Sequence, residues 1–170
     1  MTTDEKWKHF KATAKQQLNF TEQPSFLESF IEFTCEPSFD PIHNLQVIWT
    51  DKYVKWRKAK WDMQADYYKF YETDGVAKFI TSIPKATVEV KSGTAHYELM
   101  TDVVSAIRKL NVQPRIDRQT SFTLDGSTII FSLGTGDLRT TYSWHTLPEE
   151  WSELQQLVDS LLALQSHLEM

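Results

Sequence analysis

The last fifty residues decide the fold of this chain, and they read SFTLDGSTIIFSLGTGDLRTTYSWHTLPEEWSELQQLVDSLLALQSHLEM, from Ser121 to Met170. Within them, Ile129, Phe131 and Leu133 alternate with other residues. Side chains at every second position of a β-strand point to the same face. The spacing therefore predicts a strand that buries these three side chains together.

Turn signals flank this strand on both sides. An Asp-Gly pair stands at 125–126, and such a pair between apolar runs predicts a tight hairpin because both central residues of a type I′ turn need positive φ. Residues 134–137, Gly-Thr-Gly-Asp, predict a second turn, after which residues 138–145 alternate again. We therefore expect three successive strands, the first over residues 122–124, in an antiparallel meander with one buried face.

A long amphipathic helix should follow. Pro148 can occupy its first position, where a missing N–H costs no hydrogen bond, and the two acids after it lie at the positive end of the helix dipole. The apolar side chains fall on one stripe with two leucines at its flanks: Trp151, Leu154, Leu157, Val158, Leu161, Leu162 and Leu168. We expect this stripe to lie across the sheet.

The composition fits a single domain over residues 1–170. A chain of 170 residues can bury about 70% of its unfolded surface, and its hydrophobic share of 41% and charged share of 24% are ordinary. The aromatic share of 13% is high, which predicts an interior built on rings. The net charge of −5 argues against a general nucleic-acid binder, because such a domain is usually basic.

Cysteine usage and hydropathy predict the compartment. The single cysteine, Cys35, permits no internal disulfide, so nothing points to secretion, and we expect it to be a buried structural residue. The N-terminus carries acids and lacks the apolar region of a signal peptide. No apolar run approaches the roughly 18 residues of a membrane span. The expectation is a cytoplasmic protein with no membrane partner.

The residues before 121 predict alternating helices and strands. The expected helices are one that begins after Thr3 and includes Leu18, a short one opened by a capping pair at Ser25 and Glu28, and one over 101–110. The expected strands are 45–49, 76–83 and a hairpin of 87–90 with 95–99. Over 27–33 a strand competes with the short helix, because the apolar residues also alternate there.

The stretch 51–72 mixes basic and aromatic residues and then turns acidic. The first interpretation is one helix with its charges outside and this stripe inside: Tyr53, Trp56, Met63, Tyr67 and Phe70. The alternative is a hairpin of two strands broken near Lys60. Basic residues interleaved with rings over 52–61 are also what single-stranded nucleic-acid sites use, provided that the rings are exposed.

Together these patterns predict an α+β domain. Clusters of strands are interrupted by single helices, and the turn signals suit antiparallel pairing. We expect a mostly antiparallel sheet (a meander) packed against N-terminal, central and C-terminal helices.

The sequence carries no recognisable catalytic, metal or cofactor motif. Gly134 and Gly136 lack the third glycine and the Lys-Ser/Thr of a phosphate-binding loop. The five histidines are dispersed, and only His96 shares a predicted strand face with an acid, Glu98. Ser143, His145 and Asp137 could be combined into a Ser-His-Asp set, but the sequence around Ser143 is not a nucleophile elbow. We expect no enzyme and no cofactor.

The tail also resembles a group of small bacterial proteins. The shared pattern is Leu-Asp-Gly at 124–126, Tyr-Ser-Trp at 142–144 and Pro-Glu-Glu-Trp at 148–151, followed by Leu154 and Leu157. It looks like the closing hairpin and helix of uncharacterised bacterial α+β domains, some of which are immunity proteins beside polymorphic or contact-dependent toxins. The resemblance covers about the last third of the chain and implies an intracellular binding protein.

The leading hypothesis is therefore a small cytoplasmic bacterial interaction protein, an immunity protein that binds a basic toxin domain and occludes its active site. Acidic residues would steer such a partner and raise the association rate. The predicted partner-binding residues are Asp62, Asp66, Tyr67, Glu72 and Asp74. Two alternatives remain open: a small-ligand or regulatory module with an aromatic-lined pocket, and a less favoured nucleic-acid contact through Lys52 to Trp61.

Overall fold

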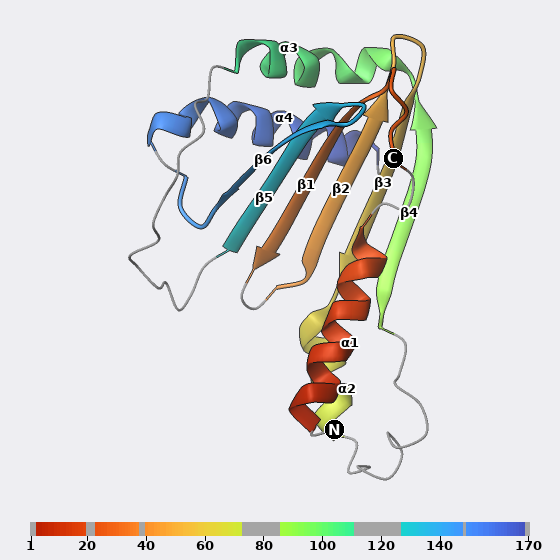
Figure 1. The fold of residues 1–170 in the computed structure, drawn as a ribbon, viewed down its shortest axis with the longest axis vertical. Helices are drawn as coiled ribbons and strands as arrows, with labels where there is room; N and C mark the ends of the chain where they lie inside the picture. The colour runs from red at the N-terminus through yellow and green to blue at the C-terminus, as the bar shows by residue number, and fades with distance from the viewer. Residues whose placement is uncertain are drawn as a thin grey trace.

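Six strands lie side by side in one antiparallel sheet (Figure 1). The structure is a computed structural model, and it describes residues 3–19, 23–37, 40–72, 86–110, 127–147 and 149–168. The strands are β1 (Ser29–Pro37), β2 (Ile42–Trp49), β3 (Val54–Trp61), β4 (Val88–Ala95), β5 (Ser127–Thr135) and β6 (Leu138–Trp144). The helices are α1 (Thr3–Leu18), α2 (Met63–Glu72), α3 (Thr101–Lys109) and α4 (Ser152–His167), with short 3₁₀ turns η2 (Tyr97–Met100) and η3 (Glu149–Trp151).

The strands follow the spatial order β4-β3-β2-β1-β5-β6, and every neighbouring pair is antiparallel. The first four strands form a meander in chain order. β5 then joins the free edge of β1, with Phe131 opposite Phe33, although these residues are far apart in the sequence. The predicted α+β class with a mostly antiparallel sheet is confirmed.

One face of the sheet packs against α3 and α4 (Figure 1). Side chains of one parity on the central strands are buried there: Ile31, Phe33, Leu45, Val47 and Phe131. α4 adds the buried side chains Leu154, Leu157, Val158, Leu161 and Leu164. The prediction that the central residues of the α4 stripe are buried is therefore confirmed, whereas Leu162 at the flank of the stripe is 46% exposed. Each large apolar side chain buried in this way contributes about 1.5–3 kcal/mol.

The opposite face carries a second, smaller core near the end of the sheet where the N-terminus lies (Figure 1). α1 contributes the four residues that its helical spacing predicts: Trp7, Phe10, Ala14 and Leu18. The sheet contributes Ile42, Ala59 and Trp61, each at most 2% exposed. The predicted first helix is confirmed. Away from this core, no helix of the described ranges covers β1, β5 and β6 on this face.

Arg57 of β3 ties α1 to the sheet. Its guanidinium donates hydrogen bonds to the main-chain oxygens of Gln17 and Leu18. These carbonyls belong to the last turn of α1, where they have no partner within the helix. The contact satisfies them and places a positive charge at the negative end of the helix dipole.

The single helix predicted over 51–72 is wrong. Residues 54–61 form β3, and α2 begins only at Met63. Trp56 packs against the core under α3 and α4, whereas Ala59 and Trp61 belong to the second core on the other face. Because helices cover both faces of β3 at different points, apolar residues occur on both parities of the strand and imitate a helical stripe. The hairpin alternative was right for its first strand only.

The short helix predicted from Ser25 is also wrong, and the competing strand is confirmed. The expected capping contact does form, since the main-chain N–H of Ser25 donates to Glu28 Oε2 at 2.6 Å. It closes a turn, after which β1 begins at Ser29. β1 is hydrogen-bonded along both edges, to β2 and to β5, and these two ladders outweigh one local cap.

The hairpin predicted over 87–99 is wrong as well. Residues 88–95 run as one strand that pairs with β3 along its whole length. Gly93, the glycine that suggested a turn, instead leaves room for the ring of Trp56. A Cβ atom added to Gly93 would lie 3.0 Å from the Trp56 ring, so a side chain there would press on the indole.

Some predictions fall outside the described residues. They are the strand over 76–83, the strand over 122–124 with its Asp-Gly turn at 125–126, and the placement of Pro148. The turn predicted over 134–137 is narrower than expected, because β5 continues through Thr135 and Gly136 then turns the chain with φ of +54°. The predicted meander of three successive strands is wrong in its first pair, because the two edges of β5 are occupied by β1 and β6.

Candidate functional site

Exposed aromatic side chains gather on α2. Tyr67, Tyr68 and Tyr71, here called the tyrosine cluster, are 42%, 49% and 38% exposed. The ring centroids of Tyr67 and Tyr71 are 4.4 Å apart, and those of Tyr67 and Tyr68 are 6.0 Å apart. The ring of Trp7 on α1 meets Tyr67 edge-on at 5.3 Å. The Tyr71 hydroxyl donates to Asp4 Oδ1 at 3.2 Å. The cluster is held from α1 while its outer surface stays open.

The predicted partner-binding residues do not form one acidic surface. Asp62 is exposed and caps α2 by accepting the N–H of Ala65 at 2.8 Å. Asp66 is only 5% exposed, so its expected place in a surface patch is wrong. Tyr67 lies in the tyrosine cluster. Asp74 and the side chain of Glu72 lie outside the described part of the chain.

Asp66 instead joins three elements. Its Oδ2 accepts the indole N–H of Trp61 at 2.9 Å and the main-chain N–H of Thr87 at 2.8 Å. Its Oδ1 accepts the Thr87 hydroxyl at 2.8 Å. The carboxylate thereby connects the end of β3, the start of α2 and the approach to β4. A buried carboxylate with this many donors is structural, because each donor would be left unpaired without it.

The basic and aromatic strand does not offer rings to a nucleic acid. Trp61 is fully buried, and Trp56 packs against the larger core. Arg57 is engaged with the end of α1. Stacking of bases needs exposed ring faces, so the condition attached to that hypothesis is not met here.

The candidate catalytic groups are not assembled. His96 precedes a 3₁₀ turn that contains Glu98, so the two do not share a strand face. The ring Nδ1 of His145 lies 3.1 Å from Thr128 Oγ1. Cys35 packs against the larger core, and burial raises the pKa of its thiol, which disfavours the reactive thiolate. Among the described residues, no three His, Cys, Asp or Glu side chains are placed to hold a metal ion.

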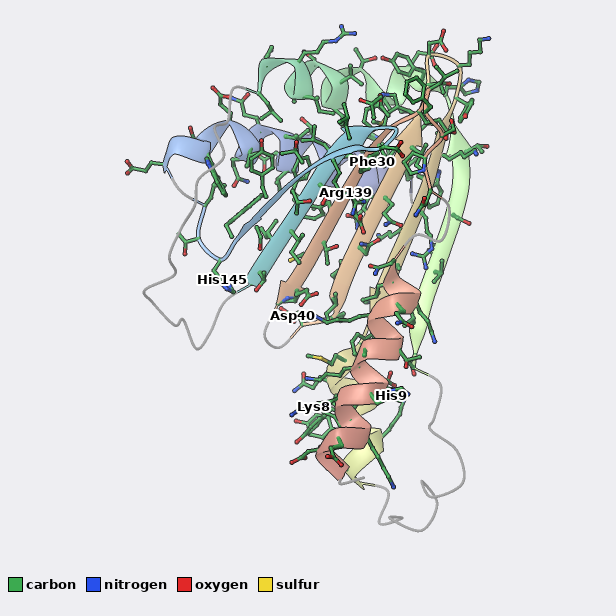
Figure 2. The ribbon with its side chains drawn as sticks, in the orientation of Figure 1. Lys8, His9, Phe30, Asp40, Arg139 and His145 are labelled. Atoms are coloured by element: carbon green, nitrogen blue, oxygen red, sulfur yellow. The ribbon has the colours of Figure 1, made fainter. Side chains whose placement is uncertain are left out.

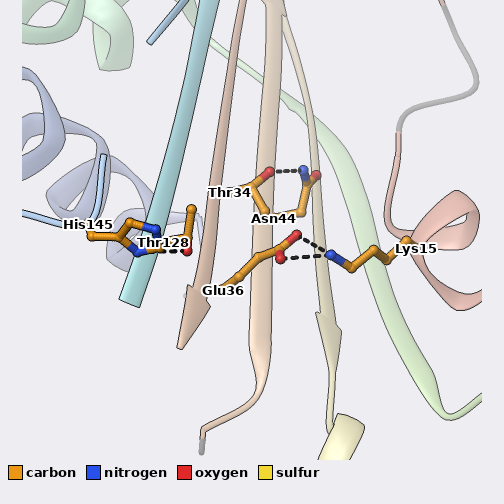
Figure 3. Close-up of polar contacts among 6 residues, drawn as sticks. All are labelled: Lys15, Thr34, Glu36, Asn44, Thr128 and His145. Atoms are coloured by element: carbon orange, nitrogen blue, oxygen red, sulfur yellow. Dashed lines mark hydrogen bonds and ion pairs between the residues drawn. The ribbon is translucent and has the colours of Figure 1, made fainter. Parts of the chain in front are cut away.

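The uncovered face of the sheet is polar. Figure 3 shows three pairs on it, of which Lys15–Glu36 links α1 to β1, whereas Thr128–His145 lies at β5 on the side away from α1. Asn44 Nδ2 donates to Thr34 Oγ1 at 2.9 Å. Lys15 of α1 donates to both carboxylate oxygens of Glu36, at 2.9 and 2.7 Å. At this end of the face the polar side chains therefore bond one another, although Asn44 Oδ1 is buried without a hydrogen-bond partner.

Farther along the same face lies an open cavity of about 430 Å³. Figure 2 labels two of its residues, Phe30 and Arg139, at the end of the sheet away from Lys8 of α1. The residues that line it come from β1, β2, the β5–β6 turn, β6 and the approach to β1: Asn19, Gln23, Pro24, Phe30, Ile31, Glu32, Gln46, Ile48, Gly136, Asp137 and Arg139. Among the described residues, Phe30 is the one aromatic residue of its lining, so this cavity is polar with a small apolar wall and is not the aromatic-lined pocket of the sequence-based alternative.

Glu32 is the centre of the polar side. Its Oε1 accepts Gln46 Nε2 at 2.7 Å from β2, and its Oε2 accepts Arg139 Nη2 at 2.9 Å from β6. The side chain of Glu32 is 17% exposed and that of Arg139 is 53% exposed. The pair is thus half-open to solvent, and its charges are available to a ligand.

Gln46 has an unusual position in this cavity. It is 6% exposed, and its Oε1 is buried without a hydrogen-bond partner. The orientation of its amide is fixed, because only the NH₂ group can face the Glu32 carboxylate. The carbonyl oxygen is therefore an acceptor that lacks a donor, which costs about 1–3 kcal/mol while it stays so.

Arg139 lies over an aromatic floor. Its guanidinium carbon is 5.0 Å from the centre of the Phe30 ring, a cation–π distance. Gly134, opposite both residues in the register, makes this possible. A Cβ atom there would lie 1.8 Å from the Leu138 carbonyl oxygen and 2.8 Å from the Phe30 ring.

The turn beside the cavity is fastened by a second buried acid. Glu28 is 6% exposed and accepts hydrogen bonds from the Tyr53 hydroxyl and from Ser25 N–H. These contacts, with that of Tyr53 the largest, hold the pKa of Glu28 below its usual value. The Glu28 carbonyl accepts the N–H of Gly136 at 3.2 Å, which joins the β5–β6 turn to the start of β1.

Two comparisons with known sequences found no relative of this chain. The chain matches no protein-family model and no curated protein sequence. In the described ranges, no helix combines the length and the apolar character needed to cross a membrane.

Sequence reasoning missed Glu32, Gln46 and Arg139. One part of the site could be predicted from the sequence: the alternation of residues 138–145 indicates which side chains of that strand point away from the core. The sequence could not show that the three side chains meet, because their meeting depends on which strands are neighbours and on the register between them.

Replacement of Asp66 should destabilise the protein. In Asp66→Ala, the Trp61 indole and the Thr87 N–H lose their acceptor, so the free energy of unfolding should fall by about 3 kcal/mol. Urea denaturation of the purified variant measures this. The exposed Asp159→Ala is the control and should change stability by less than about 0.5 kcal/mol. Equal stability of the two variants would contradict the role given to Asp66.

Glu28 should make stability pH-dependent. Because its folded-state pKa is lowered, its contribution is fully present above the unfolded-state value of about 4.3 and is lost as pH falls through the folded-state pKa. The stability difference between wild type and Glu28→Gln should therefore be largest near neutral pH and shrink in acid. Chemical denaturation across this range tests it, with exposed Glu98→Gln as control. A difference that does not change with pH would refute it.

Proposed function

We propose that this chain is an interaction protein that recognises a protein partner through the tyrosine cluster and Asp62. The observation that carries the proposal is the grouping of Tyr67, Tyr68 and Tyr71 on one helix, exposed on the outside and supported from α1. Tyrosine is enriched at protein interfaces because it offers a large, stiff contact area and a hydroxyl at small entropic cost.

The supported position of these rings favours a binding role. Trp7 meets Tyr67 and Tyr71 edge-on, at 5.3 and 6.2 Å. A partner would therefore meet rings that are already ordered, and less conformational entropy would be lost on association. Central, well-packed aromatic residues are where alanine substitutions cost most in known interfaces.

Two acids near the cluster suit a basic partner, although Lys69 on the same helix is 68% exposed. Asp4 is bonded to Tyr71, and the exposed Asp62 immediately precedes α2. The whole chain carries a net charge of −5. Acidic groups beside an aromatic contact would raise the rate of encounter with a basic surface.

We extend this proposal to the immunity type. The partner would be a basic toxin domain made by the same bacterium, and binding would occlude its active site in the cytoplasm. The support is the resemblance of the last third to domains that include immunity proteins, together with the aromatic surface and the acidity.

The test is capture of the partner and measurement of its affinity. The wild-type chain, tagged at its C-terminus, should retain the product of a neighbouring toxin gene when the two are co-expressed. Tyr67→Ala combined with Tyr68→Ala should weaken binding about thirtyfold, because two central rings are removed. Tyr71 is left in place because it bonds Asp4.

A matched control is Phe26→Ala. Phe26 is 84% exposed but lies in the turn before β1, outside the tyrosine cluster. Its removal should leave the affinity unchanged. Unchanged affinity in the double tyrosine variant, with folding intact by circular dichroism, would show that the partner binds elsewhere.

A further inference from the structure

We propose that the cavity on the open face of the sheet binds a free α-amino acid with an apolar side chain. This inference goes beyond the partner-binding function, because the cavity and the tyrosine cluster are built from different residues and can be tested separately. It rests on three features: an acceptor without a donor, an arginine with unused donors and an apolar wall beside these polar groups.

The first feature is the acceptor. Gln46 is 6% exposed, lines the cavity and holds a buried Oε1 without a hydrogen-bond partner. Each oxygen of the neighbouring Glu32 accepts one of the hydrogen bonds described above, and a carboxylate oxygen has room for a second. An ammonium group carries three N–H donors and could satisfy both residues.

The second feature is the arginine. Arg139 uses Nη2 for Glu32, a single contact at 2.9 Å, and lies over the Phe30 ring. A guanidinium has five N–H donors in a planar fork, so an edge remains that matches a carboxylate in a bidentate pair. A ligand carboxylate would bind there without displacing Glu32.

The net charge decides between ligand classes. A simple anion would meet Arg139 but would face Glu32 and the exposed Asp137, both of which line the cavity. A simple amine would satisfy Gln46 and Glu32 but would leave Arg139 without an anion. An α-amino acid zwitterion supplies both groups on the same carbon and adds no net charge to a site that already holds an ion pair.

The third feature sets the side chain. Phe30 and Ile48 line the same cavity and are 6% and 3% exposed. They offer an apolar wall beside the polar groups. The cavity of about 430 Å³ lies within the roughly 300–1,000 Å³ of small-molecule sites, so a branched aliphatic side chain can be accommodated.

The test uses L-leucine and two analogues, each with one end blocked, on the wild-type protein by titration calorimetry. Leucinamide keeps the ammonium group and lacks the carboxylate. N-acetyl-L-leucine keeps the carboxylate and lacks the ammonium group. Leucine should bind at least tenfold more tightly than either analogue. These analogues also stand for the two ends of a polypeptide, so equal binding of one of them would assign the cavity to a chain terminus and overturn the proposal.

Two variants identify the contacts. Arg139→Met should weaken leucine binding at least tenfold but should not weaken leucinamide binding, because the ligand's carboxylate contact is lost while the Glu32 carboxylate stays available to the ammonium group. Gln46→Met should reduce the preference for leucine over N-acetyl-L-leucine, because Glu32 alone would then meet the ammonium group. Arg108→Met, on α3 at the covered face, is the control and should bind leucine like wild type. Arg139 is half exposed, so its variant should fold normally, which circular dichroism verifies.

Three results would overturn the inference. They are no heat of binding with 10 mM L-leucine, equal affinity for leucine and an analogue, and leucine binding that survives Arg139→Met unchanged. None of them bears on the tyrosine cluster, and loss of partner binding in the tyrosine variants would not affect leucine binding.

Discussion

The pairing of β1 with β5 is the constraint on which the rest of this structure depends. It sets Phe33 opposite Phe131 and turns a four-stranded meander into a six-stranded sheet. Both strands then contribute to the core beneath α3 and α4. Because side chains alternate with period two, a slip of β5 by one residue in this register would move Phe131 from the core to the open face.

The same pairing creates the cavity. Glu32 and Arg139 lie on strands separated by β5, and they meet only because the β5–β6 hairpin is placed beside β1. Gly134 keeps the intervening strand free of a side chain there. The tyrosine cluster depends on another arrangement, the contact of α1 with α2 at the end of the molecule that holds the N-terminus (Figure 1). One scaffold thereby carries two separate candidate surfaces.

The parts of the fold that the sequence predicted are those with an uninterrupted local pattern. The apolar stripes of α1 and α4 and the strand around Phe131 each repeat with a single period, and they were identified correctly. β3 was misassigned because its two faces meet two cores. The strand β4 was divided because Gly93 looked like a turn, although it lies against Trp56. Asp66 looked like a surface acid because nothing local shows that Trp61 and Thr87 reach it.

The register of β1 against β5 is the most direct test of this account. In a uniformly labelled sample, nuclear Overhauser contacts across the two strands would report it without any mutation. The structure predicts main-chain contacts that place Ile31 opposite Leu133 and Phe33 opposite Phe131. Contacts displaced by one residue, or β5 paired with some strand other than β1 and β6, would contradict both the core and the cavity.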